Sequence, residues 1–306
     1  MADIAASVLA KLKNKAKASG ISYQQCLQLF FQEEFLRRLA GSKYADNFVL
    51  KGGLFIYTLT NFESRATVDV DFLMRGLNND LARMDEIIAE ILAVDTGNDF
   101  VTFKATKTEP IAVQRKYHGV SAQITGYIKN VRVPFNVDIG VGDVIVPRAE
   151  RRNIQTQLEG YDKPEILTYS LESTIAEKLD AILQRFELTG RMKDFYDIYY
   201  LSRTFDFDGL KLQTAIQETL QNRGTAYEKD SFDRVVALVN DEDMQIKWRY
   251  FLKSLGSSDL LFAQVIQEIK TFLGPIWNAI INEDEFGGKW CASDGQWFYR
   301  WQRAIR

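Results

Sequence analysis

The first part of the chain carries patterns that predict two long helices. Residues 22–44 have a helical character, with Ser22 and Gln25 forming a capping box at the start and Gly41 following the end. Residues 80–95 repeat isoleucine and leucine at helical spacing. We therefore expect a helix in each of these two segments.

A different period, in which side chains alternate, marks the segments expected to form strands. Residues 66–74 alternate and are rich in β-branched residues. Residues 100–106, 119–128 and 131–141 follow as three further β-rich segments, which predict successive strands of an antiparallel or mixed sheet. Before them, residues 47–61 pass through a glycine pair into a probable short helix.

From residue 167 onward the pattern becomes helical almost throughout. Three aromatic segments near the end are also expected to be helices, namely residues 248–255, 265–277 and 297–305. We therefore predict an α+β (α/β) fold in two parts. A mixed sheet with flanking and N-terminal helices would occupy residues 1–160, and an all-helical C-terminal domain would occupy residues 161–306.

Composition and charge narrow the class of protein without identifying it. Hydrophobic residues make up 46% of the chain and charged residues 26%, which is typical of a soluble globular protein. The net charge of -3 argues against a general nucleic-acid coat protein. Two distant cysteines and no signal-peptide or membrane-span pattern indicate a cytoplasmic protein. The single histidine, His118, argues against a histidine-based triad or a zinc site with several histidines.

Two carboxylates within an apolar strand are the first candidate for chemistry. In an extended segment Asp69 and Asp71 point to the same face, roughly 7 Å apart along the strand. Asp138 similarly interrupts the apolar pattern of a later strand. If the two strands are neighbours, the three acids converge and could hold two Mg²⁺ ions for phosphoryl transfer. An Asp-x-Asp strand alone is more often the solvated face of an edge strand.

Positive charge and a glycine pair lie near the acidic strand. Lys51 and Arg65 bracket the segment between them, and Gly52 and Gly53 stand before a short helix, where glycines can form a cradle for phosphate. A tight turn is the simpler interpretation of the glycine pair.

Two charged residues lie within apolar stripes of the helical half. Lys178 falls in the stripe of its predicted helix, and Asp194 shares a stripe with Ile198 and Leu201 in the next helix. A lysine that extends its amine to a rim, or a buried ion pair joining the two helices, explains these positions as well as a catalytic role does.

The motifs taken in order resemble those of the AbiEii/AbiGii nucleotidyltransferase toxins, a branch of the DNA polymerase β-like nucleotidyltransferase superfamily. The segments that carry the resemblance are "FVLKGG", "RATVDVDF", "FNVDIGVGD", "ESTIAEKLDAI" and "RMKDFYDIYYL". The resemblance implies a nucleotidyltransferase-like fold and a toxin of type IV toxin–antitoxin and phage abortive-infection systems. It also implies a cognate antitoxin that need not contact this protein directly.

The resemblance further implies an NTP substrate, Mg²⁺ and an RNA acceptor, with the tRNA 3′ end as the acceptor of some relatives. Asp69, Asp71 and Asp138 would then bind metal and act in catalysis, and Asp138 would activate the acceptor hydroxyl. The triphosphate would be held by the remaining candidates, which are Lys51, Gly52, Gly53, Arg65 and Lys178. Asp194 would orient Lys178 or contact the nucleotide, and the active cleft would lie between the two halves.

Two other functions compete with RNA modification. The same fold could nucleotidylate or phosphorylate a protein, or the chain could be an inactive member of the family that only binds a partner. The presence of Asp69, Asp71, Asp138 and Lys178 disfavours the inactive alternative.

Overall fold

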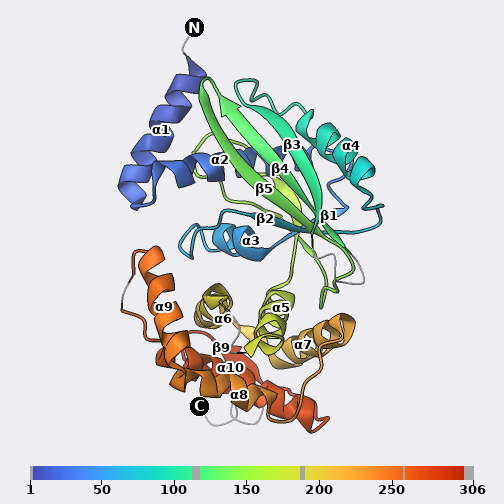
Figure 1. Ribbon diagram of the computed structural model, residues 1–306, viewed down its shortest axis with the longest axis vertical. Coiled ribbons are helices and arrows are strands. Elements are labelled where there is room, and N and C mark those ends of the chain that lie inside the picture. The colour runs from blue at the N-terminus through green and yellow to red at the C-terminus, as the bar shows by residue number, and fades with distance from the viewer. Residues whose placement is uncertain (1–2, 112–117, 187–189, 258, 300–306) are drawn as a thin grey trace. The chain divides into compact units, whose positions relative to one another are not determined.

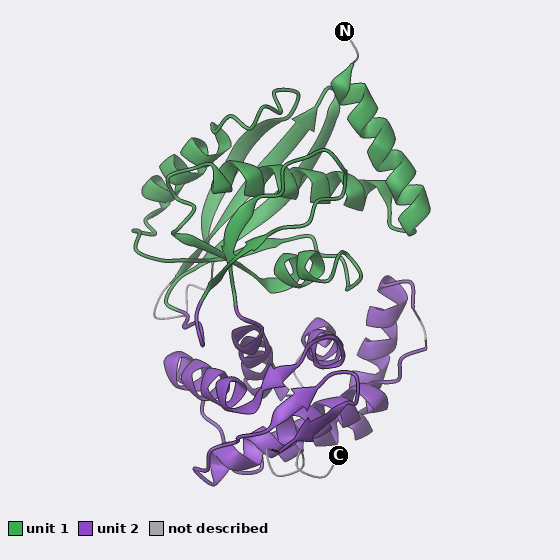
Figure 2. Ribbon diagram, turned by 180° about the vertical axis from the view of Figure 1, so that it is seen from behind, with its two compact units in different colours: residues 1–142, 149–169 green, residues 143–148, 170–306 purple. Residues whose placement is uncertain are grey.

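The computed structural model describes residues 3–111, 118–186, 190–257 and 259–299. The chain forms two compact units, which Figure 2 shows in different colours. Unit 1 comprises Met1–Gly142 and Ala149–Tyr169, and unit 2 comprises Asp143–Arg148 and Ser170–Arg306. The chain therefore passes between the units after residues 142, 148 and 169.

Unit 1 is built on a mixed seven-stranded sheet with the order β3-β4-β5-β2-β1-β7-β6. The strand β1 runs parallel to β7, β2 runs parallel to β5, and the other neighbouring strands are antiparallel. The strands are β1 (Phe48–Lys51), β2 (Val70–Met74), β3 (Thr102–Ile111), β4 (Gly119–Ile128), β5 (Val131–Gly140), β6 (Glu150–Asn153) and β7 (Glu165–Thr168). The predicted mixed sheet is therefore confirmed.

Helices cover one face of this sheet. The helices of unit 1 are α1 (Ile4–Ser19), α2 (Tyr23–Ala40), α3 (Gly52–Leu59) and α4 (Leu81–Leu92) (Figure 1). The capping box of Ser22 and Gln25 forms as predicted at the start of α2. From the middle of α2, Phe35 packs its ring against Phe72 of β2 and Phe135 of β5, at centroid distances of 6.1 and 6.3 Å. The apolar face of the central strands is thus the core face.

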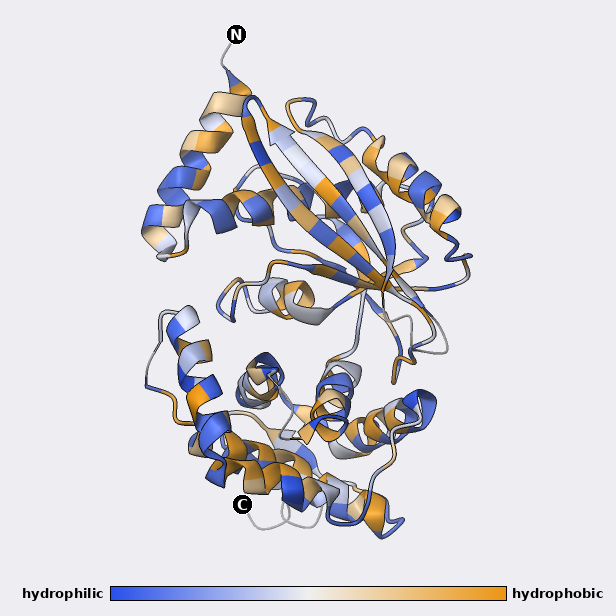
Figure 3. Cartoon of the chain, viewed as in Figure 1, coloured by the Kyte–Doolittle hydropathy of each residue, from blue (hydrophilic) through white to orange (hydrophobic). Residues whose placement is uncertain are grey.

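The other face of β3, β4 and β5 is open within unit 1. None of the described helices of this unit crosses it in Figure 1, whereas α2 crosses the sheet when the molecule is seen from behind in Figure 2. Hydrophilic and hydrophobic residues alternate along these strands (Figure 3). Such alternation is typical of an antiparallel sheet with one buried and one solvated face.

The acidic strand begins later than its sequence pattern predicts. The expected strand started at residue 66, but β2 starts at Val70, and Val68 is 58% exposed although its neighbours at alternate positions are buried. The side-chain amides of Gln28 and Gln32 on α2 donate hydrogen bonds to the carbonyl oxygen of Val68, at 2.5 and 2.7 Å. Because this carbonyl bonds to side chains of α2, it does not continue the ladder of the sheet.

Unit 2 is helical, as predicted, but also contains a small sheet. Its helices are α5 (Leu171–Leu183), α6 (Met192–Thr204), α7 (Gly209–Arg223), α8 (Ser231–Ala237), the 3₁₀-helix η2 (Leu238–Asn240), α9 (Glu242–Ser254) and α10 (Phe262–Ile281). A three-stranded sheet, ordered β10-β9-β8, joins β8 (Phe207–Asp208), β9 (Lys289–Cys291) and β10 (Gln296–Phe298). None of the described helices in either unit is both long and apolar enough to traverse a bilayer.

The prediction of a helix over residues 297–305 is wrong where the structure describes it. Trp297 lies in β10, where its ring stacks on Phe272 of α10 and its indole N–H donates to the Phe272 carbonyl oxygen at 2.9 Å. The turn before it contains Gly295 with a φ of 63°, a conformation that favours glycine and joins β9 to β10. Residues 300–306 of that prediction lie outside the described residues.

A buried arginine holds the segment Asp143–Arg148 within unit 2. Arg223, at the end of α7, makes ion pairs with Asp143, Glu177 and Asp180 at 2.9–3.0 Å. Burial by itself disfavours the charged guanidinium, but the three carboxylates outweigh burial and the pKa of Arg223 is raised. Arg223 is therefore a charged centre that ties a short crossing segment to α5 and α7.

Candidate active site

A row of polar residues runs across the middle of the sheet in unit 1. In the parallel pair of β2 and β5, Asp71 and Asp138 are register partners. Lys51 of β1 is the partner of Asp71 on its other side, and Ser121 of β4 is the partner of Asp138. Side chains of register partners point to the same face, and neighbouring strands lie about 4.8 Å apart. The sheet thus brings together two of the three predicted acids.

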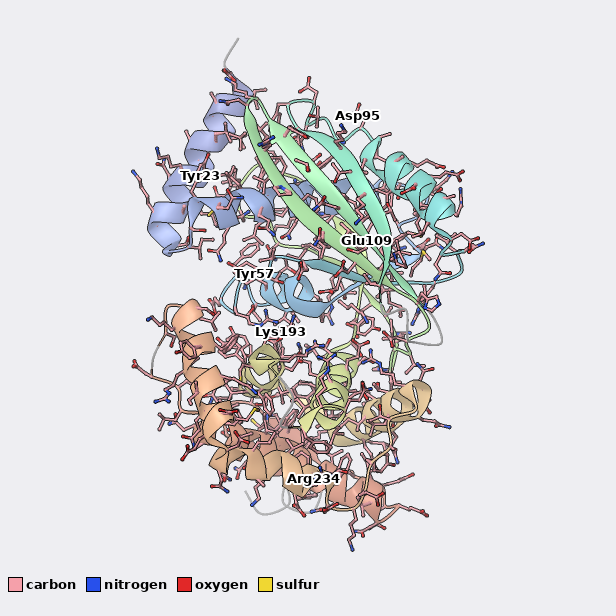
Figure 4. All side chains as sticks on the ribbon, viewed as in Figure 1. Tyr23, Tyr57, Asp95, Glu109, Lys193 and Arg234 are labelled. Atoms are coloured by element: carbon pink, nitrogen blue, oxygen red, sulfur yellow. The ribbon has the colours of Figure 1, made fainter. Side chains whose placement is uncertain are left out.

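Hydrogen bonding and ring contacts fix the two ends of this row. The hydroxyl of Ser121 donates to Oδ1 of Asp138 at 2.5 Å, which orients that carboxylate. The ammonium of Lys51 lies 5.2 Å from the centroid of the Tyr169 ring. Glu109 of β3, labelled in Figure 4, is the register partner of Ser121 and extends the row to the sheet edge. Sequence reasoning missed Ser121, whose position in the alternation was its only signal.

The predicted glycine bend lies directly beside Asp71. Gly52 has a φ of 69°, in the left-handed region, and begins α3. A Cβ atom at this position would lie 2.1 Å from Oδ2 of Asp71, a distance at which only glycine fits. A Cβ at Gly53 would lie 2.7 Å from Oγ1 of Thr67. The backbone at the start of α3 therefore approaches the acidic row as closely as a chain can, with the unpaired N–H groups of a helix N-terminus at this place.

The third predicted acid, Asp69, lies in the loop before β2 and is half-buried. Arg65 lies in the same loop and is also half-buried. Among the residues that the structure describes, no three His, Cys, Asp or Glu side chains are grouped closely enough to hold a metal ion. The expected cluster of three carboxylates is therefore reduced to the pair of Asp71 and Asp138, since Asp69 is not held by the ladder of the sheet.

The oxygen donors of this row nevertheless fit a divalent cation. Two carboxylates at neighbouring register positions repel each other, and a cation between them relieves that repulsion. Carboxylate oxygens are the ligands that Mg²⁺ prefers, and Mg²⁺ typically takes only one or two carboxylates together with water and substrate phosphates. Asp71 and Asp138 satisfy this requirement without a third acid.

The charged residues predicted in the helical half form a buried cluster in unit 2. The ammonium of Lys178 lies 2.5 Å from Oδ2 of Asp197 and 3.3 Å from Oδ1 of Asp194. The side chain of Arg191 reaches Oδ2 of Asp194 at 2.6 Å. Lys178 is 8% exposed, Asp194 is 0% exposed and Asp197 is 1% exposed. Lys193, between these positions on α6, is exposed and is labelled in Figure 4.

This cluster matches the ion pair expected between Lys178 and Asp194, and it adds Asp197, which makes the shorter contact with the lysine. The spacing could have indicated this, because residues three apart on a helix face the same neighbour. One lysine between two buried carboxylates, with an arginine beside one of them, is close to charge balance. Burial of this charge is therefore supported within unit 2 itself.

A mixed sheet that sets a glycine bend against paired carboxylates is typical of enzymes that transfer phosphoryl or nucleotidyl groups. A scan against protein families matches residues 34–271 to the family described as nucleotidyl transferase AbiEii toxin of type IV toxin–antitoxin systems. The match covers more than half of the chain, and the chain belongs to this family. The predicted family, enzyme class and toxin character are confirmed.

Solved structures with similar folds include three nucleotidyltransferases or related chains. MenT4, a nucleotidyltransferase toxin from Mycobacterium tuberculosis, is 16% identical with a TM-score of 0.49, and the match covers 76% of this chain and 72% of that one. JHP933 from Helicobacter pylori is 14% identical, with a TM-score of 0.48 and coverage of 86% and 95%. A putative nucleotidyltransferase from H. pylori is 15% identical, with a TM-score of 0.47 and coverage of 84% and 98%. A search of curated proteins gave no match.

Proposed function

We propose that this toxin transfers a nucleoside monophosphate from an NTP, bound with Mg²⁺, to the 3′ end of an RNA, with tRNA as the acceptor. The observation that supports the proposal best is the register of Asp71 beside Asp138 with the backbone of Gly52 against Asp71. This arrangement offers carboxylates for a metal and backbone amides for a triphosphate at one place on the sheet.

The reaction requires one bond to form and one to break. The acceptor hydroxyl oxygen attacks the α-phosphorus of the NTP, the bond between the α-phosphorus and the bridging oxygen breaks, and pyrophosphate leaves. A divalent ion held by Asp71 and Asp138, with Asp69 from the adjoining loop, would neutralise charge on the triphosphate. Asp138 accepts the proton of the acceptor hydroxyl, and Ser121 keeps the carboxylate of Asp138 oriented for this role.

The remaining candidates act on the phosphates. The backbone N–H groups of Gly52 and Gly53 donate to phosphate oxygens at the start of α3. Lys51 and Arg65 supply positive charge in unit 1. Lys178 is proposed to neutralise phosphate charge during transfer. Its buried position between acids supports a lysine with a fixed amine.

Asp194 is proposed to position the amine of Lys178, from which it lies 3.3 Å away. As a toxin of a type IV system, the chain is expected to be opposed by a cognate antitoxin that forms no stable complex with it. Intact RNA 3′ ends in cells with antitoxin, and extended ends in cells without it, are the outcome that this proposal requires.

The experiment incubates the purified protein with each labelled NTP and Mg²⁺, in the presence of either tRNA or lysate protein. Label should enter tRNA with the wild-type chain, and Asp69→Ala and Asp71→Asn should abolish this transfer. Asp85→Asn on α4, an exposed carboxylate remote from the row in register, serves as the matched control and should remain active.

Cells provide the second readout. Induction of the wild-type protein should inhibit growth and alter RNA 3′ ends in deep sequencing, and Asp69→Ala should relieve both effects. Label entering protein in place of tRNA would refute the RNA acceptor, and full activity of Asp69→Ala and Asp71→Asn would refute the assigned chemistry.

A further inference from the structure

The open face of the antiparallel strands in unit 1 has a composition that the proposed reaction does not use. Register places nine side chains on this face between the far end of the strands and the acidic row. We call them the platform: Thr102, Lys104, Lys107, Gln123, Thr125, Tyr127, Arg132, Pro134 and Asn136. Most of them are exposed, and Thr125 and Tyr127 are half-buried.

The platform carries positive charge and no carboxylate. Its charged members are Lys104, Lys107 and Arg132, while Glu109 and Asp138 belong to the next row. Lys107 makes an ion pair with Glu109, at the border between the platform and the acidic row. In a chain of net charge -3, a face with three bases and no acid is a local departure from the average.

A β-bulge in β3 is what brings both lysines to this face. Lys104 pairs with Thr125 and Lys107 pairs with Gln123, so the two lysines are three residues apart on β3 but face two partners that are two residues apart on β4. In a regular strand, side chains three residues apart point to opposite faces. The extra residue, Thr106, donates its hydroxyl to the side chain and the carbonyl of Gln123 at 3.0 and 3.1 Å. Bulges near functional sites commonly re-aim side chains in this way.

The platform leads from the acidic row along the strands. Arg132 lies six positions before Asp138 on β5, a distance of about 20 Å in an extended strand. Tyr127 is the register partner of Arg132 and supplies an aromatic ring beside it. A bound strand whose end reaches Asp138 would therefore meet an aromatic ring and basic groups further along the same face.

We propose that the platform binds the single-stranded segment that precedes the reacting 3′ end of the acceptor, with phosphates on Lys104 and Arg132 and a base stacked on Tyr127. The inference rests on the proposed function, because it requires an acceptor hydroxyl at Asp138. Phosphate oxygens are repelled by a row of carboxylates, so the acceptor must leave the site across a face without acids. The platform is such a face, and it is continuous with Asp138 on one strand.

Charge and composition select this occupant over a folded protein. A protein partner would need large apolar anchors to bury, and the platform offers Pro134 and the half-buried ring of Tyr127 as its main apolar groups. Single-stranded nucleic acid needs basic groups for its backbone and a ring for its bases, and both are present.

The test compares binding of a fluorescently labelled single-stranded RNA of mixed sequence, with a free 3′ hydroxyl, to the full chain over a range of salt concentrations. Lys104→Glu combined with Arg132→Glu should weaken binding at least tenfold. If both phosphate contacts are lost, the slope of log affinity against log salt should fall in magnitude by about 1.4, which is about 0.7 for each contact. Tyr127→Ala should weaken binding by about tenfold with little change in this slope.

The matched control reverses two charges elsewhere. Lys211→Glu with Lys270→Glu changes the net charge equally on exposed positions of α7 and α10, and RNA affinity should stay within about twofold of the wild type. Lys104→Gln with Arg132→Gln serves as the milder pair if charge reversal disturbs folding. Binding of Mg²⁺ and NTP should be unchanged in all these variants.

Three outcomes would overturn the inference: equal RNA affinity of platform variants and wild type, equal losses in the platform and control variants, or no RNA binding by the wild-type chain. A wild-type chain that transfers nucleotides to RNA while platform variants transfer equally well would refute the platform alone. A chain that binds RNA through the platform but transfers no nucleotide would instead refute the proposed function.

Discussion

Replacement of Gly52 by alanine tests the close approach on which the site depends. The new Cβ atom would lie 2.1 Å from Oδ2 and 2.7 Å from Cγ of Asp71. Normal contacts between non-bonded heavy atoms need about 3.5 Å, so the carboxylate has to move by roughly 1 Å or more. Asp71 is a flexible side chain and can rotate away, but it then leaves its position beside Asp138.

Stability and activity should respond differently to Gly52→Ala. The φ of 69° imposes a backbone cost of about 1–2 kcal/mol on any residue with a Cβ. A displacement of about 1 Å in a reacting group can reduce the rate roughly a hundredfold, equivalent to about 3 kcal/mol of activation free energy. We therefore expect a modest loss in the free energy of unfolding and a much larger loss of nucleotide transfer.

Gly97→Ala is the matched control for this prediction. Gly97 has a φ of 73°, but a Cβ there would meet no atom within 4 Å. It should reproduce the cost in stability, measured by urea unfolding, and leave initial rates of nucleotide transfer near those of the wild type. Equal transfer rates for Gly52→Ala and Gly97→Ala would refute the reasoning that Gly52 sets the position of Asp71.

Two further predictions concern buried charge. Lys178→Ala should lower the free energy of unfolding by about 3–5 kcal/mol, because Asp194 and Asp197 remain buried without their cation; a loss below about 1 kcal/mol in urea unfolding would contradict the buried ion pair. Glu33, buried in α2, has a pKa raised from 4.5 to about 7, mainly because burial disfavours its charge, while Arg37 and Gln157 oppose the shift. Between these values the folded chain keeps a proton that the unfolded chain releases, so the free energy of unfolding should fall by about 3 kcal/mol as pH rises from about 4.5 to about 7. Urea unfolding across this range should show the fall in the wild type relative to Glu33→Gln, and parallel pH profiles of the two proteins would argue against a raised pKa.

Local signals predicted the elements that depend on local chemistry. The capping box of Ser22 and Gln25, the helix that starts at Gly52, and the buried stripe position of Lys178 depend on residues a few positions apart, and the structure confirms them. The alternation around Asp138 correctly assigned its face, because one side of β5 packs on α2 and the other does not.

Features that depend on distant residues were beyond such signals. The start of β2 is set by Gln28 and Gln32, whose amides bind the carbonyl of Val68 from another element. The strands β8, β9 and β10 have only two or three residues each, too few to reveal a period.

The pairing of Asp71 with Asp138 was stated only as a condition in the sequence, because alternation gives the face of each strand but not its neighbour. The sheet order supplies that neighbour by placing β5 beside β2 in parallel. The roles assigned to Asp69, Asp71, Asp138, Lys178 and Asp194 stay predictions until the variants are measured.

The three passages of the chain between the units have a practical consequence for dissecting this enzyme. A fragment ending at residue 160 would lack β7, so β1 would expose an unpaired edge next to Lys51. A break after residue 142 would leave β6 and β7 on the second piece, while β1, their neighbour in the sheet, stays on the first. Co-expressed halves divided at that point should therefore reassemble through strand pairing, so that growth inhibition would report on their complementation.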